Sequence, residues 1–340
     1  MKKIVNWFLA AFGLVMNLQL FADVQTTLTE GLSAEMKTFY DMTLIDEAAP
    51  ALVHDQFGQK RPIPKDGGKT IEFRKFSPLA KALTPLTEGV TPQGKSLDVT
   101  TVTAEVSQYG DFVTMSDMLE LTAIDNVVVE ALKLLGRQGG ATLDTVVRNV
   151  LQSGTNVMYC PKLGTGGAET AVTSRSGLDA TCKLTVKVIQ QAVAKLRSQN
   201  APNIQGKYVA IIHPYAAYDL MRDPDWIDAH KYAQPDNLFE GEIGEIAGVR
   251  FVQTTEAKIY TGGVFGTLVF GDGAYGTTDI AGGGMETIVK QKGSAGTADP
   301  LDQRSSVGWK GLKTAELLVE QYMVRIESKS PDFSANLAEN

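Results

Sequence analysis

The eight residues GVTPQGKS, from Gly89 to Ser96, match the spacing G-x-x-x-x-G-K-[ST] of loops that bind nucleotide phosphates. Such a loop works because a buried strand delivers it and a helix begins directly after it, with free N–H groups facing the phosphates. The residues before it read KALTPLTE, which is not a core strand, and those after it alternate with the period of a strand. The flanks favour a surface turn between two extended segments. A P-loop nucleotide hydrolase stays the alternative from a different functional class.

Other residues that could do chemistry lack the companions that chemistry needs. The three histidines, His54, His213 and His230, are far apart and none is near a cysteine, and the chain has no G-x-S-x-G motif. The aspartates around Trp226 lack the central Gly and the final Glu of a calcium loop. GDGAYG, residues 271–276, follows a strand, but no helical pattern follows it. The sequence therefore predicts no enzyme activity, and no catalytic, cofactor-binding or metal-binding residue.

Composition bounds the class of protein. The chain has 340 residues, of which 43% are hydrophobic and 21% charged, so it is long enough for a sizeable core and two or more subdomains. A net charge of −7 argues against wrapping DNA, which needs a basic face. Two cysteines, Cys160 and Cys182, define neither a disulfide framework nor a metal site, and we expect them to be reduced.

The N-terminus allows three interpretations. Residues 1–22 form an apolar leader that begins MKKIVNWFLAAFGLV, which has the outline of a secretory signal and would fit a secreted binding protein. Leu20 is poorly suited to a cleavage site before Asp23, and the apolar run is short for a membrane span. In the third interpretation, Met16 is the true start of the protein.

The middle of the chain is organised around a long hairpin. TIEFRKF, residues 70–76, is expected to pair with LDVTTVTAEV, residues 97–106, across a connection rich in Pro and Thr. Loops of that length inside a compact domain are uncommon unless they are functional. A hairpin with two polar faces cannot stabilise itself, so we expect residues 59–113 to project and to rest on something else.

Helices and strands follow in separate runs. Residues 126–151 have the apolar spacing of a long helix, in which Gly139 and Gly140 indicate a bend or a close contact. A second helix is expected over 185–198, and a buried strand over 208–212. TLVFGDGAYG, METIVKQK and LKTAELLVEQYMVRIES read as later strands. Segregated helices and strands predict the α+β class.

This layout resembles the major capsid proteins of tailed bacteriophages over roughly residues 17–328. The most specific segments are LTEGVTPQGKSLDVTTVTAEVSQYGDFVTMSD, GKYVAIIHPYAAYDLMRD, GEIGEIAGVRFVQT and LVFGDGAYG. NLQLFAD, residues 17–23, resembles the opening of such coat proteins and favours Met16 as the start. The resemblance implies an N-terminal arm (23–58), an extended β-hairpin loop (59–113), the spine helix of a peripheral domain (114–153), an axial domain (154–260), and return strands of the peripheral domain with a tail (261–340).

The resemblance also implies a function. It implies a structural protein without cofactors that self-assembles as hexamers and pentamers into the icosahedral head shell around a phage genome. The virion would be its final location and the host cytoplasm its place of assembly. Its partners would be other copies of itself, a separate scaffolding protein and a portal; DNA would be enclosed without specific binding, and no membrane is involved. An encapsulin-like compartment shell, which has the same fold, is the nearer alternative.

Charge suggests how copies could meet. Residues 60–81 carry seven basic residues against two acidic ones, a balance of +5, whereas residues 219–258 carry four basic against nine acidic, a balance of −5. We therefore expect the basic loop to dock on an acidic surface of an adjacent copy. Some relatives cross-link a loop lysine, but no motif here identifies a partner asparagine, so cross-linking is not expected. The expected subunit-contact residues are Lys69, Phe73, Arg74, Lys75, Phe76, Lys81 and Lys95.

Overall fold

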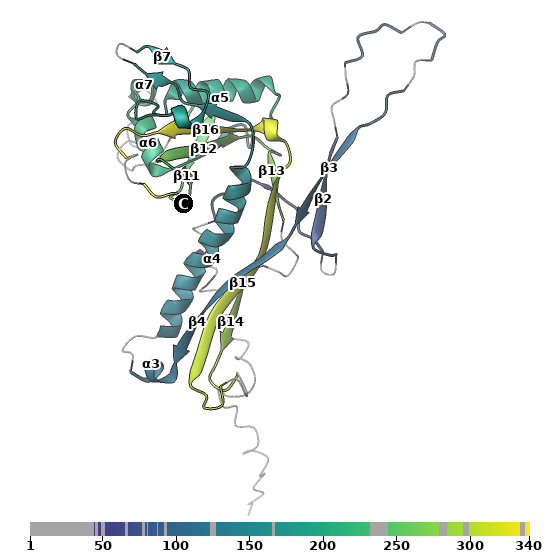
Figure 1. Cartoon of the computed structure of the whole chain (residues 1–340). Coiled ribbons are helices and arrows are strands. Elements are labelled where there is room, and N and C mark those ends of the chain that lie inside the picture. The colour runs from purple at the N-terminus through teal and green to yellow at the C-terminus, as the bar shows by residue number, and fades with distance from the viewer. Residues whose placement is uncertain are drawn as a thin grey trace, which may run out of the picture.

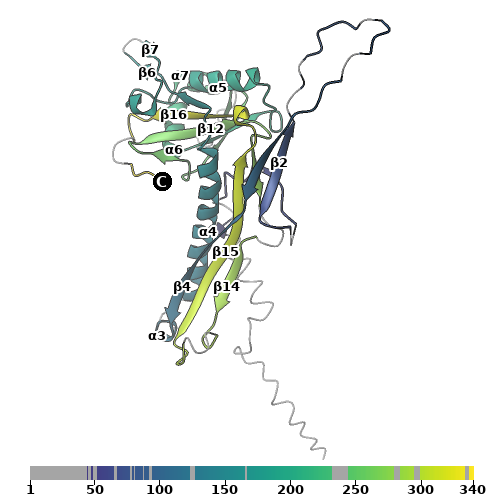
Figure 2. The same ribbon diagram turned by 45° about the vertical axis from the view of Figure 1, so that its right-hand side comes forward.

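The computed structural model describes residues 44, 47–48, 52–64, 67–76, 79, 81–86, 88–91, 94–122, 127–164, 167–231, 244–278, 284–294, 299–333 and 337–340. The leader, the predicted start at Met16 and most of the predicted N-terminal arm lie outside these residues. The described part has three regions: a compact unit, an elongated unit beside a long helix, and a projecting two-stranded hairpin (Figures 1 and 2).

The compact unit is a seven-stranded sheet with the order β5-β16-β12-β8-β10-β9, in which β11 also pairs with β12. Its strands are β5 (Val157–Tyr159), β8 (Tyr208–Ile212), β9 (Glu245–Ile246), β10 (Val249–Gln253), β11 (Ile259–Tyr260), β12 (Val264–Phe270) and β16 (Met323–Lys329). Its helices are α5 (Val186–Ser198), α6 (Pro214–Met221), α7 (Pro224–Lys231) and the short η3 (Arg175–Gly177). A small ribbon, β6 (Lys162–Leu163) with β7 (Glu169–Thr170), lies at its edge.

Both faces of the seven-stranded sheet are covered. Every residue of β8 and β12 is buried, as expected for strands packed on two sides. One face packs against α5 and α6 in a cluster that includes Ile189 and Ala210. The other face packs against the last turns of α4 (Val127–Leu151), through Val147 and Leu151. The long helix thus ends inside the core of the compact unit.

The elongated unit is a five-stranded sheet with α4 along it (Figure 1). Its central strand is β15 (Arg304–Leu317), which pairs with β4 along one edge. Along the other edge β15 pairs first with β14 and then with β13. Val307 and Trp309 on β15 pack against Leu132 and Leu135 of α4. The elements are β1 (Gln59–Lys60), β4 (Ser107–Ser116), α3 (Asp117–Thr122), β13 (Tyr275–Thr278), β14 (Glu286–Lys290), β15 (Arg304–Leu317) and η5 (Glu320–Tyr322).

Two glycines of α4, Gly139 and Gly140, allow other segments of the chain to pack closely against the helix. The helix continues through both Gly139 and Gly140 without interruption. A Cβ on Gly140 would lie 2.5 Å from the carbonyl oxygen of Ala48, and one on Gly139 would lie 3.1 Å from the ring of Trp309. These distances are too short for ordinary packing, so only glycine lets the N-terminal segment and β15 approach the helix this closely.

The projecting hairpin is β2 (Thr70–Phe76) paired with β3 (Val99–Glu105) in a sheet of its own. The pairing runs antiparallel from Thr70 opposite Glu105 to Phe76 opposite Val99, which confirms the predicted strand pair. The projection is nevertheless shorter than residues 59–113. β1 pairs with β13, and β4 pairs with β15 in the elongated unit. The alternating pattern runs on from β3 into β4, so the sequence does not mark where the chain changes its partner.

The strands predicted over residues 261–340 lie in two different units. β12 and β16 lie in the seven-stranded sheet of the compact unit, and only β13, β14 and β15 belong to the elongated unit. An apolar strand pattern shows that a strand is buried, but it does not identify the sheet in which the strand pairs.

Candidate assembly surfaces

The phosphate-loop motif lies at the tip region of the β2–β3 connection and lacks its helix. Gly89 has φ of +79° and lies in a turn. Residues 94–98 form neither helix nor strand, and β3 begins at Val99. No helix N-terminus therefore follows Ser96, and the loop has no dipole to bind phosphate. The geometry of these residues does not support the alternative of a P-loop nucleotide hydrolase.

His213 and Asp223 have structural roles in the compact unit. Nδ1 of His213 accepts a hydrogen bond of 3.2 Å from the N–H of Tyr215 at the start of α6, and its ring stacks on Phe265 with centroids 5.0 Å apart. Burial lowers the pKa of His213 to about 4. Asp223 accepts a 2.8 Å hydrogen bond from the N–H of Val186 at the start of α5. Both side chains satisfy helix ends.

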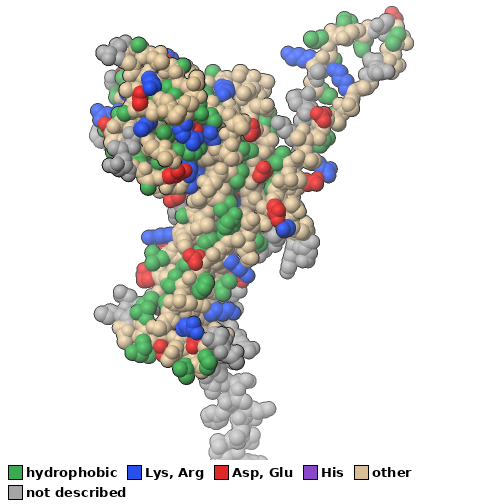
Figure 3. All heavy atoms as spheres, viewed as in Figure 1, with side chains coloured by type: hydrophobic (Ala, Val, Ile, Leu, Met, Phe, Trp, Pro, Cys, Tyr) green, Lys and Arg blue, Asp and Glu red, His purple; other side chains and the backbone are tan. Residues whose placement is uncertain are grey.

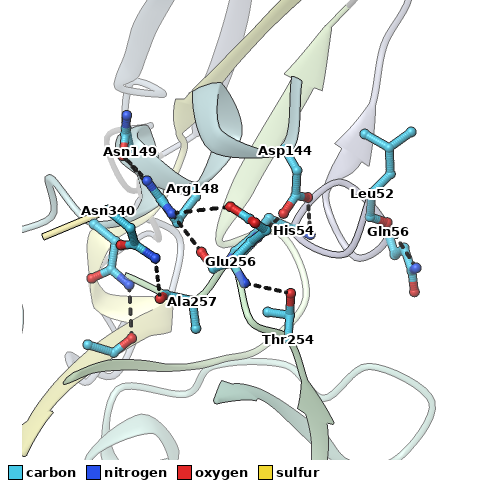
Figure 4. Close-up of polar contacts among 12 residues, drawn as sticks. Leu52, His54, Gln56, Asp144, Arg148, Asn149, Thr254, Glu256, Ala257 and Asn340 are labelled. Atoms are coloured by element: carbon cyan, nitrogen blue, oxygen red, sulfur yellow. Dashed lines mark hydrogen bonds and ion pairs between the residues drawn. The ribbon is translucent and has the colours of Figure 1, made fainter. Parts of the chain in front are cut away.

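A buried polar junction links α4 to the N-terminal segment on one side and to the compact unit on the other (Figure 4). Asp144 accepts hydrogen bonds from the backbone N–H of His54, at 2.7 Å, and lies 2.6 Å from its Nδ1. One turn later, Arg148 donates a 2.8 Å hydrogen bond to the carbonyl oxygen of Glu256 in the compact unit. Both Asp144 and Arg148 are buried, and burial lowers the pKa of the Arg148 guanidinium. This junction was not predicted, although two opposite charges four residues apart on an apolar helix face are a signal for it.

A second buried charge, Glu327 of β16, is also held internally. Arg175 donates to both of its carboxylate oxygens, at 2.6 and 2.7 Å, and Nε of Arg325 lies 3.1 Å from Oε1. The Arg175 guanidinium lies 3.6 Å from the ring centre of Tyr260. Within the described residues, no group of three or more His, Cys, Asp or Glu side chains is placed to hold a metal ion. These clusters stabilise the fold.

Among the described residues, the exposed large apolar side chains other than Ile227 of α7 lie in two places (Figure 3). The first, here named the loop set, lies on the β2–β3 connection and at the start of β3; it comprises Leu79, Leu83, Leu86, Val90, Leu97 and Val99. The second, the distal set, lies on β4, α3, the first half of α4 and the turn before β15; it comprises Phe112, Val113, Met118, Leu119, Leu121, Leu134 and Leu301. Groups of exposed large apolar side chains are candidate sites of protein–protein contact.

The predicted subunit-contact residues fall into three groups: four are exposed, two have side chains outside the described part of the chain, and Phe73 is buried. Lys69, Arg74, Lys81 and Lys95 are exposed; the first forms an ion pair with Glu105 across the hairpin. The side chains of two others, at positions 75 and 76, lie outside the described part of the chain.

Phe73, the third group, is buried within its own chain. It is 3% exposed, and its ring meets Gly276 of the same chain, where an added Cβ would lie 2.8 Å from it. Its position in an alternating strand did not show that one face of β2 rests on β13.

The predicted acidic surface at 219–258 is not one free surface in its described part. Asp219 and Asp223 are buried. Glu245 forms an ion pair with Lys207, and the Glu256 carboxylate lies 3.8 Å from Arg148. Charge counting along the sequence could not separate carboxylates that cap and pair within the fold from those that face solvent.

The described helices include none that is long and apolar enough to cross a membrane. Residues 99–320 match the family described as phage capsid protein. A comparison with curated protein sequences gave no match.

Solved structures share the fold. The capsid of cyanophage P-SCSP1u has a TM-score of 0.63 at 14% identity, covering 82% of this chain and 88% of that one. The capsid of cyanophage Pam1 has a TM-score of 0.61 at 13% identity, covering 83% and 92%. A virus-like particle from Pyrococcus furiosus has a TM-score of 0.50 at 10% identity, covering 86% and 99%.

Proposed function

Because the chain belongs to the phage capsid protein family, we propose that it is the major subunit of an icosahedral head shell that encloses a phage genome. Its role as a structural capsid shell protein follows from the family and from the fold that it shares with phage capsids. The observation that supports self-assembly most directly is the loop set, because these apolar side chains project from the chain on a connection that no core of the same chain covers.

The finer assignments extend this proposal. The copies form hexamers and pentamers, assemble in the host cytoplasm with a separate scaffolding protein and a portal, and enclose DNA without binding a specific sequence. The net charge of −7 supports the last point, since tight DNA wrapping needs a basic protein face.

Electron microscopy of the purified full-length chain, with sedimentation velocity, tests the proposal. We expect ring-shaped capsomers or closed shells. A chain that stays monomeric over a hundred-fold range of concentration (about 1 to 100 μM), and also in the presence of crowding agents, would count against self-assembly.

Five basic residues of the hairpin and its loop are proposed subunit contacts, with Phe76 as an apolar neighbour: Lys69, Arg74, Lys75, Lys81 and Lys95. We expect the double substitution Arg74→Glu with Lys75→Glu to slow assembly most at low salt, because charge complementarity mainly sets association rate and is screened over about 10 Å at 0.1 M salt. The matched control is Arg74→Lys with Lys75→Arg, which keeps the charge. Equal light-scattering kinetics for both variants across a salt series would exclude an electrostatic contribution.

A second candidate is an encapsulin-like compartment shell. The likeness to the Pyrococcus furiosus particle, which is covered over 99% of its chain, favours it, but the TM-score is lower than for the phage capsids. Particles isolated from the natural source decide between the two, because a phage head contains double-stranded DNA and a compartment contains protein.

A further inference from the structure

The outer edge of β11 in the compact unit is bonded by the C-terminal segment of the chain. β11 pairs with β12 on its other side. The N–H of Ile259 donates a 2.8 Å hydrogen bond to Oδ1 of Asn340, and the carbonyl oxygen of Ile259 accepts one of 3.4 Å from the Asn340 N–H. Nδ2 of Asn340 donates to the carbonyl oxygen of Ala257 at 3.1 Å (Figure 4). Asn340 therefore bonds this edge as a neighbouring strand would, and sheet edges are places where peptides bind.

Glu339 adds a charged contact next to this pairing. Its Oε2 accepts a 2.7 Å hydrogen bond from the hydroxyl of Thr261, and its Oε1 lies 3.3 Å from Nζ of Lys258. The hydrogen bond from Thr261, and after it the contact with Lys258, lower the pKa of the Glu339 carboxyl. Lys258 also donates to the main-chain oxygen of Asn340. One short stretch, residues 257–261, thus contacts both Glu339 and Asn340.

A second anchor of the same segment lies on α6. The ring of Phe333 stacks on that of Tyr215, with centroids 4.4 Å apart, and meets the ring of Tyr218 at 5.3 Å in a T-shaped contact. Tyr215 and Tyr218 are three residues apart, so they lie on the same side of the helix. Such aromatic pairs stabilise beyond the area that they bury. An aromatic side chain in a fixed place, together with backbone bonds at a sheet edge, is a combination that recognises peptides.

The C-terminal segment lies on the compact unit without entering its interior. Ser330 is fully buried, whereas none of the described residues after it is. Residues 331–333 and 337–340 belong to no helix or strand, and most of them are exposed. Releasing this segment therefore removes no strand from the seven-stranded sheet.

The stretch that the segment covers is also where the compact unit meets α4. Glu256, directly before Ala257, accepts the 2.8 Å hydrogen bond from Arg148 through its carbonyl oxygen (Figure 4). Arg148 and Asn340 thus bond the carbonyl groups of two adjacent residues. A change at one of these bonds acts directly on the backbone that carries the other.

We propose that residues 257–261, with the platform of Tyr215 and Tyr218, form a peptide-binding site. Its ligand is residues 331–340 of the same chain, which act as a detachable clasp and hold the stretch in place beside α4. The ligand class is a peptide with a phenylalanine near one end and, seven residues later, an asparagine preceded by an acidic residue. This inference goes beyond the proposed shell function and does not depend on assembly, so the unassembled chain tests it.

A fluorescent peptide with the sequence of residues 331–340, PDFSANLAEN, is titrated into the chain shortened to end at Ser330, and anisotropy measures binding. We expect saturable binding, and binding about ten-fold weaker or more to the full-length chain, because its own tethered clasp competes at a millimolar effective concentration. In the peptide, Asn340→Ala and Phe333→Ala should each weaken binding about ten-fold. Ala338→Ser, at an exposed residue, is the matched control and should not. A folded shortened chain that binds no peptide, or a full-length chain that binds it equally well, would overturn the inference.

The full-length variant Asn340→Ala gives a second readout without shortening the chain. The N–H of Ile259 loses its acceptor, so its hydrogen exchange, measured by NMR, should become several-fold faster. The N–H of Gly266, which donates to Lys258 from β12, is the internal control and should exchange as before. An unchanged rate at Ile259 would refute the clasp. If the shortened chain does not fold, the peptide is titrated into full-length Phe333→Ala with Asn340→Ala, which must bind it more tightly than the wild type for the inference to stand.

Discussion

The compact unit and the β2–β3 hairpin differ in how far they bury their side chains. In the compact unit even charges are enclosed: Glu327 is fully buried between two arginines, and both central strands are covered on each face. On the hairpin connection, apolar side chains such as Leu83 and Leu86 are about four-fifths exposed. Burial of apolar surface is the main favourable term in folding, so the connection gains little of it from its own chain.

This difference separates two tasks. The core of the compact unit is buried within the single chain. The apolar side chains of the connection stay exposed in the single chain, so the free energy of burying them is available for association. The contrast predicts that substitutions at packed sites of the compact unit and of α4 lower the stability of the unassembled protein, whereas those on the connection leave it unchanged. Four substitutions test this, from the largest effect on unfolding to the smallest.

The largest effect is expected from Glu327→Gln. Removing the carboxylate leaves Arg175 and Arg325 without their shared partner, which we expect to lower the free energy of unfolding by about 2–3 kcal/mol, after allowance for the partial exposure of Arg175. Chemical denaturation of the unassembled chain measures it. Glu320→Gln is the control, because this residue is exposed and its side chain bonds Thr155. Equal midpoints for the two variants would contradict the assigned role of Glu327.

A smaller effect is expected where α4 meets the N-terminal segment. Alanine favours a helix over glycine by up to about 1 kcal/mol, but a Cβ at Gly140 would lie 2.5 Å from the Ala48 carbonyl oxygen. We therefore expect Gly140→Ala to lower stability by about 1–2 kcal/mol and to speed hydrogen exchange around residues 52–58. Gly94→Ala on the connection has no atom within 4 Å of its Cβ and should have no such effect. Stabilisation by Gly140→Ala would show that the close approach is dispensable.

The next effect depends on pH and belongs to the compact unit alone. His213 has its pKa lowered by burial from 6.5 to about 4. Below pH 6.5 the unfolded chain takes up a proton at this position and the folded chain does not, so stability falls as the pH drops from 6.5 towards 4. His213→Asn keeps an acceptor for the N–H of Tyr215 and should remove about 1 kcal/mol of that loss. Parallel denaturation curves of both proteins at pH 7 and pH 4.5 give the comparison, and an identical pH dependence would refute it.

The smallest effect is expected on the connection. Leu83 is 83% exposed, so Leu83→Ser should leave the unfolding midpoint of the unassembled chain unchanged within error. Differential scanning calorimetry at a concentration below assembly checks this. A clear drop in the midpoint would mean that the connection packs on its own chain, and would remove the contrast between the two regions.

The sequence predicted what depends on local pattern. The long helix, the β2–β3 pair and the buried strand at 208–212 followed from apolar spacing, and each is present. What local pattern leaves undetermined depends on partners distant in the chain. Whether β12 joins β13 or β16, whether Phe73 faces β13 or a neighbour, and whether Asp223 caps α5 or faces solvent are set by tertiary packing. The His54–Asp144 contact joins residues 90 positions apart, and a single sequence gives no measure of that distance in space.

The strand β15 has a mechanical consequence. It runs the length of the elongated unit, is bonded to β4 from Arg304 to Lys313, and then leads through η5 into β16 within the compact sheet. A force applied between Ser116, at the end of β4 away from the compact unit, and the compact unit itself therefore acts on all of these hydrogen bonds in shear. The bonds share this force, so they must break together. Such a ladder yields only at high load, whereas pulling the strands apart sideways opens it one bond at a time. The elongated unit should therefore resist extension along β15 more strongly than separation of its strands.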